Sequence, residues 1–159
     1  MTVGRGVFVH NSSFRNNGQG IDVTGASGEA TRVTVDSSSF ESNNFGVYLT
    51  NKVNGVIRNS IITNNATTGI SATSKDPTLL GQLLVDNCQV HQNPVGIGVS
   101  VGGRGGQILR RSRSTITDSS IGGVSATAAT GVYSLGDNVF GVNSQDVIGS
   151  GLFTTLAKK

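Results

Sequence analysis

The chain has 159 residues, which fits one domain, and only 13% of them are charged, about half the share of an ordinary globular domain. A net charge of +3 and few aromatic residues argue against a nucleic-acid surface, and the single Cys88 excludes an internal disulfide framework. The 23 glycines, together with many Asn, Ser, Thr, Val and Ile residues, favour short strands and turns over disorder.

The first ten residues lack the cationic and apolar regions of a signal peptide, and no apolar stretch is long enough to span a membrane. The compartment therefore stays open, and the chain could be a mature or truncated piece of a longer secreted protein.

Six short segments of similar sequence follow one another along the chain. Each contains an apolar anchor, with Asn or Ser three residues after it and a small polar residue or Cys two residues before it. The anchors are 26, 22, 28, 26 and 24 residues apart, and such a period indicates one unit stacked on copies of itself. The anchors are Phe14, Phe40, Ile62, Val90, Ile116 and Phe140.

Each repeat is predicted to contain three short strands. In the first strand, apolar residues occupy the positions seven and five residues before the anchor, as expected for a strand with one buried face. In the last repeat these positions hold Tyr133 and Leu135. The second strand carries the anchor, and the third follows a glycine, as at Gly46 and Val47. This pattern predicts an all-β domain over residues 1–159, a parallel β-helix of about six coils spanning residues 6–145.

The Asn residues that follow the anchors are predicted to be structural. We expect each one to begin a turn, since Asn tolerates left-handed backbone. Stacked coils would place their amides roughly 4.8 Å apart, where they can form a polar ladder. The ladder residues are Asn17, Asn43, Asn65, Asn93 and Asn143, with Ser119 in the fifth repeat.

Both ends of such a rod need a cover, because a terminal coil exposes core and unpaired strand edges. Residues 146–159 could fold over the last coil as a cap. The first coil is expected to be bare, either because residues are missing or because another subunit covers it. The outward apolar residues Phe8, Val56 and Leu84 also suggest a side-by-side homo-oligomer.

The pattern Val-x-Val-x-Asn-Ser-x-Phe-x-x-Asn-x-x-Gly-Ile-x-Val, from Val7 to Val23, resembles the bacterial right-handed parallel β-helix repeat proteins. These are related in fold to pectate lyases and polygalacturonases and are often extracytoplasmic. The resemblance implies a right-handed coil and raises the question of polysaccharide cleavage. The polygalacturonase motifs Asn-Thr-Asp, Asp-Asp, Gly-His-Gly and Arg-Ile-Lys do not occur in this chain, so the resemblance is specific for architecture.

An outward column of charged residues is the candidate for a catalytic site. It lies four residues before the anchors and contains His10, Asp36, Arg58 and Asp86. Asp36 and Asp86 would lie roughly 9.6 Å apart, two rungs of the stack, with Arg58 between them. An arginine there lowers the pKa of both carboxyls, which works against a general acid. The column is either a salt-bridge ladder or a saccharide-binding or catalytic strip.

A basic segment in the fifth repeat could bind an anionic polysaccharide such as a polyuronate, with His10 as a further contact, because guanidinium groups bind carboxylates bidentately. Strict alignment points Arg111 inward, where an unpaired charge is costly. We therefore expect either a local shift that turns Ile108 and Leu109 inward or a carboxylate near Arg111. The segment contains Arg104, Arg110, Arg111 and Arg113.

The absent motifs favour a non-catalytic module, alone or as part of a longer solenoid, that presents loops to a glycan or protein partner. The alternative is a carbohydrate-active lyase or hydrolase that uses Asp36, Arg58 and Asp86 on an anionic polysaccharide. His10 and His91 fall in different columns, so no metal is expected. No cofactor, nucleic acid or membrane partner is expected either.

Overall fold

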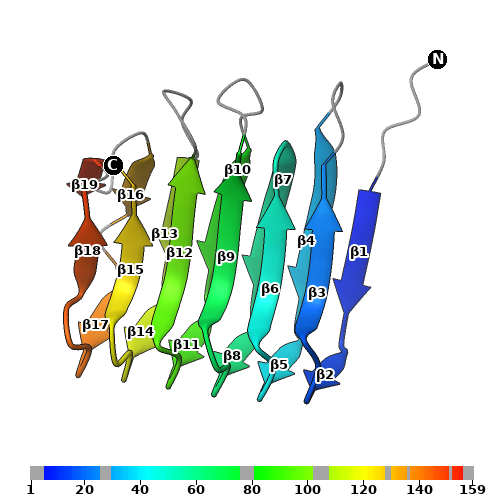
Figure 1. Cartoon of the computed structure of the whole chain (residues 1–159), viewed down its shortest axis with the longest axis horizontal. Coiled ribbons are helices and arrows are strands. Elements are labelled where there is room, and N and C mark those ends of the chain that lie inside the picture. The colour runs from blue at the N-terminus through cyan, green and yellow to red at the C-terminus, as the bar shows by residue number, and fades with distance from the viewer. Residues whose placement is uncertain are drawn as a thin grey trace.

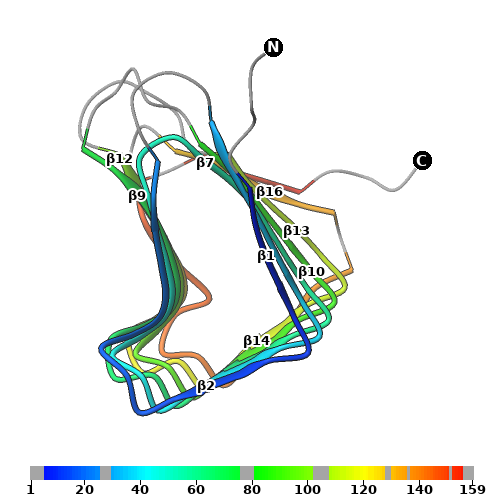
Figure 2. The ribbon, with the colours of Figure 1, turned by 90° about the vertical axis from the view of Figure 1, so that its right-hand side faces the viewer.

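The computed structural model describes residues 6–25, 30–75, 81–101, 108–127, 130–135, 137–150 and 152–155, without the side chains of residues 101, 108–111 and 152. In this part the chain contains strands and turns only, and the strands stack side by side along a rod (Figure 1). Seen along the rod, the strands of each sheet lie behind one another, and successive coils repeat one outline except for the last, orange coil, which departs from it (Figure 2). The molecule is therefore a parallel β-solenoid.

Three parallel sheets run the length of the rod. Sheet A contains β1 (Gly6–His10), β4 (Thr31–Asp36), β7 (Val53–Arg58), β10 (Gln82–Asp86), β13 (Ile108–Ser112), β16 (Gly131–Ser134) and β19 (Leu152–Thr155). Sheet B contains β2 (Ser13–Arg15), β5 (Ser39–Glu41), β8 (Ile61–Thr63), β11 (Gln89–His91), β14 (Thr115–Thr117) and β17 (Val139–Gly141). Sheet C contains β3 (Gln19–Thr24), β6 (Phe45–Thr50), β9 (Thr68–Ser74), β12 (Val95–Val101), β15 (Gly122–Ala126) and β18 (Val147–Gly149).

The strand register confirms the predicted columns. All six anchors are direct partners in sheet B, and the rings of Phe14 and Phe40 stack 5.1 Å apart. One strand from each sheet makes one coil, so the described strands form about six coils, as the repeat predicted. The interior is apolar, since side chains at alternate positions of each strand point into it.

The sequence alignment of the last repeat was wrong by one residue. Val132, only 1% exposed, and Ser134 point inward there, in place of the predicted Tyr133 and Leu135. Val132 pairs with Leu109 but lies eight residues before its anchor, whereas Leu109 lies seven before its own. The turn after β16 thus contains one extra residue, and a shift of one position exchanges the two faces of a strand.

The left-handed turn residues are also displaced from the predicted positions. Six of them come two residues after the anchors, directly before the ladder position, and five lie three residues before an anchor. Asn51, between β6 and β7, belongs to neither set. The ladder Asn residues are not left-handed, and those of the inner coils, Asn43, Asn65 and Asn93, are buried within the rod. The left-handed residues are Asn11, Asn16, Ser37, Ser42, Asn51, Asn59, Asn64, Asn87, Gln92, Arg113, Asp118 and Val142.

A column of glycines in sheet C brings neighbouring coils into close contact. A Cβ on Gly46 would lie 2.5 Å from the carbonyl oxygen of Gly69, and a Cβ on Gly69 would lie 2.7 Å from that of Gly96. Such distances are shorter than any normal contact, so only glycine fits. The glycine predicted to precede each third strand is the second residue of that strand, from β3 to β15, and packing between coils requires it there.

The segment predicted as a C-terminal cap supplies two more strands. β18 pairs with β15 and β19 pairs with β16, so this part of the chain continues sheets C and A. Residues 156–159 lie outside the described part.

Candidate functional site

The predicted charged column lies along the C-terminal ends of the sheet A strands. His10, Asp36, Arg58 and Asp86 are successive partners in the strand register, as the alignment predicted. Arg58 Nη2 lies 3.1 Å from Asp36 Oδ2, and His10 Nδ1 lies 3.8 Å from the same oxygen. Asp36 is therefore the centre of a small charged group, held between the coil before it and the coil after it.

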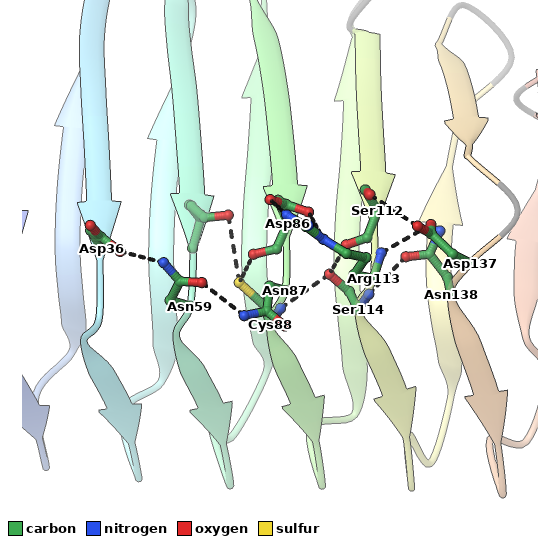
Figure 3. A network of polar contacts seen from close by, with 11 residues as sticks. Asp36, Asn59, Asp86, Asn87, Cys88, Ser112, Arg113, Ser114, Asp137 and Asn138 are labelled. Atoms are coloured by element: carbon green, nitrogen blue, oxygen red, sulfur yellow. Dashed lines mark hydrogen bonds and ion pairs between the residues drawn. The ribbon is translucent and has the colours of Figure 1, made fainter. Parts of the chain in front are cut away.

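Arg58 does not bridge the two carboxylates. Asp86 is paired with Arg113, whose Nη2 and Nε lie 2.5 Å and 3.2 Å from its two carboxylate oxygens (Figure 3). Arg113 has a φ of 48° in the turn after β13, and its backbone N–H donates to Asp137 Oδ1. This bidentate bond raises the pKa of Arg113. One of the predicted binding arginines is thus already engaged by the protein.

A row of amides follows the charged column through the adjoining turn, and the sequence analysis missed it. Asn59 Nδ2 donates to Asp36 Oδ1 at 2.8 Å, and Asn87 Nδ2 donates to Asn59 Oδ1 at 2.8 Å (Figure 3). Both residues have φ of 51°, which places their side chains one above the other at the corner. The signal was present in the sequence, because Asn recurs three residues before three of the anchors.

Asp36 is held in its ionised form. The hydrogen bond from Asn59 lowers the pKa of this carboxyl most, and Arg58 and Ser37 lower it further, against the opposing effect of burial. Asp36 is only 9% exposed. A general acid needs a raised pKa near the working pH, so this environment suits a structural or binding carboxylate better than a proton donor.

Cys88 lies in the column of small residues before the anchors, where its thiol donates to the carbonyl oxygens of Asp86 at 3.3 Å and Ile57 at 3.5 Å. Burial raises the pKa of this thiol to about 11, and the residue is 1% exposed. The surroundings are those of an inert structural thiol, because the thiolate is the reactive form.

We expect Cys88 in the folded protein to react with a disulfide reagent about a hundredfold more slowly than in urea, measured by the absorbance of the released thiol. The pKa of the Cys88 thiol in the folded protein lies above the usual 9.0, so protonation of this thiol favours the folded state. That contribution to stability is lost as the pH rises from 9 towards 11. Equal rates in the two states would show that the thiol is accessible.

A shallow depression of about 320 Å³ lies on the outer face of sheet A, on the N-terminal side of the predicted charged column along the same strands. Val56 and Leu84 are neighbours in its floor, as the outward apolar column predicted, and Thr34 continues that column. A parallel column of polar side chains borders them and was not singled out from the sequence. It consists of Arg32, Asn54 and Gln82, which are direct register partners.

Arg32 is exposed, and no carboxylate of the described residues lies within 4 Å of its guanidinium. In this it differs from Arg15, which is paired with Glu41 on sheet B, and from the paired Arg58 and Arg113. The depression therefore combines two amides and an apolar floor with a positive charge that has no carboxylate partner among the described residues.

The predicted basic segment lies largely outside the described part. This applies to Arg104 and to the side chains of Arg110 and Arg111. The backbone register of β13 shows no shift, since Leu109 pairs with Leu83 and Arg111 pairs with Val85. The predicted displacement of the strand is therefore wrong, and a carboxylate near Arg111 stays a prediction.

Among the described residues, no group of three His, Cys, Asp or Glu side chains is placed to hold a metal ion. In the same part of the chain, no helix has the length and apolar character needed to cross a membrane.

Comparison with known proteins gives one result for the family. The family model described as a right-handed beta helix region matches residues 2–141. No curated protein and no solved structure matches the chain. The family match gives the coil its right-handed sense and indicates no substrate.

Proposed function

Because the chain belongs to the family of right-handed β-helix regions, we propose that it is a non-catalytic module that binds an acidic glycan on the outer face of sheet A. The observation that carries this proposal is the depression bordered by Arg32, Asn54 and Gln82. A regular sheet holds these side chains in a row, so a linear polymer along the rod would meet repeated contacts.

The chemistry of the depression suits a uronate chain. The Arg32 guanidinium can bind a carboxylate through two parallel hydrogen bonds. Asn54 and Gln82 each offer both a donor and an acceptor to sugar hydroxyls. Val56 and Leu84 provide apolar area for the faces of the sugar rings.

The bonding of the acidic residues supports binding over cleavage. Asp36 and Asp86 are both held by arginines, and the pKa of Asp36 is lowered. The alternative is a lyase or hydrolase in which these residues and Arg58 act on the same kind of polymer. That reaction requires one of them to gain a raised pKa or to leave its partner when substrate binds.

We expect Arg32→Ala to weaken binding of polygalacturonate oligosaccharides about tenfold, because a hydrogen bond to a charged group contributes about 1.5–3 kcal/mol. Isothermal titration calorimetry with the whole chain measures the change. Arg15→Ala is the matched control, since it removes an arginine on sheet B that is paired with Glu41. A methyl-esterified polymer should bind weakly to all three proteins.

Unchanged binding by Arg32→Ala would show that the depression is not the glycan-binding site. Release of unsaturated or reducing ends that Asp36→Asn abolishes would establish the enzymatic alternative. The apolar column of the same face could instead pack on a second copy of the chain. Sedimentation that depends on concentration, and persists at saturating glycan, would assign the column to a homo-oligomer.

A further inference from the structure

The asparagine ladder makes the same two contacts in four coils. The Oδ1 atom accepts a hydrogen bond from the backbone N–H of the ladder residue in the preceding coil, as Asn65 does from Asn43 at 3.1 Å. The Nδ2 group donates to the carbonyl oxygen of the preceding anchor, as Asn65 does to Phe40 at 3.2 Å. The same pair of contacts is made by Asn43, Asn65, Asn93 and Asn143.

Ser119 interrupts this pattern in the fifth coil. It is 1% exposed, and its Oγ atom has no hydrogen-bond partner among the described residues. An Asn at position 119 would accept a hydrogen bond from the backbone N–H of Asn93. With Ser119 in its place, no described residue accepts from that N–H, although Asn93 is itself only 1% exposed. The carbonyl of Val90 likewise receives no ladder amide, although its equivalents Phe40 and Ile62 do.

We infer that this interruption is a binding site for one internal water molecule. The serine side chain has two heavy atoms fewer than that of asparagine, which corresponds to room for about one water molecule. The polar groups around this position supply what such a water needs, namely a donor in the Asn93 N–H, an acceptor in the Val90 carbonyl and a hydroxyl on Ser119. Buried polar groups are nearly always bonded to protein or to ordered water, and an apolar ligand would leave the Asn93 N–H and the Ser119 hydroxyl unsatisfied.

The water takes the place of the missing carboxamide. It accepts from Asn93, as Oδ1 does in the other coils, and donates to Val90, as Nδ2 does to the other anchors. The interior of the rod therefore holds solvent at one defined level, although the same position in the coils on either side is filled by protein.

Two opposite substitutions test this site in the full chain. Ser119→Asn should complete the ladder and expel the water, and Asn65→Ser should create an equivalent site two coils earlier. In ¹⁵N-labelled protein, the wild type should show a water cross-peak to the amide of Asn93, measured by a rotating-frame Overhauser experiment. That cross-peak should vanish in Ser119→Asn, and a new one should appear at the amide of Asn43 in Asn65→Ser.

Stability gives an independent readout. We expect Ser119→Asn to lower the unfolding equilibrium constant about fivefold in urea titrations, because direct bonds replace an immobilised water. A wild type without the Asn93 cross-peak would overturn the inference. So would a cross-peak of equal strength in Ser119→Asn, because the water would then occupy some other position.

Discussion

Gly46→Ala should lower the free energy of unfolding by about 3 kcal/mol, measured by urea denaturation, because the new Cβ would lie 2.5 Å from the backbone oxygen of Gly69. Neither atom is at the end of a flexible side chain, so the conflict cannot be relieved by a rotamer change. The two coils must move apart, and this lengthens the hydrogen bonds between β6 and β9. Further contacts at 3.0 Å with Ile62 and 3.1 Å with Asn65 hold the new methyl group from the other sides.

Gly98→Ala is the matched control on the same sheet. A Cβ there would meet only Thr68 Cγ2 at 3.5 Å and Val95 Cγ1 at 3.8 Å, which are ordinary contacts. We expect a change within about 1 kcal/mol of zero, with the gain from a less flexible unfolded chain as the main effect. If the two substitutions cost the same, the glycine column would have no special role in the spacing of the coils.

Asn93→Ala should destabilise the protein by about 3–4 kcal/mol, because it leaves several buried polar groups without partners at once. The backbone N–H and Nδ2 of Asn65 lose their acceptor at 3.0 Å and 2.9 Å. The carbonyl oxygens of Ile62 and His91 lose donors at 3.1 Å and 2.9 Å. Thermal and urea unfolding, followed by circular dichroism, measure the loss.

Asn44→Ala provides the comparison, since Asn44 is exposed and its side chain accepts a hydrogen bond from Thr67 alone among the described residues. Its loss should cost less than about 1 kcal/mol, as expected for a polar group that water can reach. An equally small effect of Asn93→Ala would mean that the ladder positions side chains without contributing to stability.

The coil architecture could be predicted because the same residue types recur at the same offsets from each anchor. Hydrophobic alternation identifies the buried face of a strand, and repetition identifies which strands are neighbours. The anchor column, the buried amides and the close-packed glycines all follow from those two signals, since stacked coils place equivalent residues in contact. The buried face of the first strand in the last repeat was predicted wrongly, because the extra residue before Phe140 exchanges the two faces of β16.

The partners of the charged side chains could not be predicted in the same way. Register placed Arg58 between Asp36 and Asp86, but a long side chain can reach forwards or backwards along the rod with equal ease. The turn after β13 decided the outcome, because the left-handed backbone of Arg113 directs its guanidinium to Asp86. The depression at Arg32 was missed for a related reason, since its importance depends on the absence of a nearby carboxylate within the described residues.

The sequence by itself determined the coil, its three strands and the columns that line its interior, because these depend on the order and spacing of residue types. Only the tertiary structure decided which exposed charges are paired, which turn residue is left-handed and where the polar ladder is incomplete. Those features depend on distances of a few ångströms between side chains from different coils. Residue spacing fixes which coils are neighbours, but it leaves the side-chain directions to the packing of the folded rod.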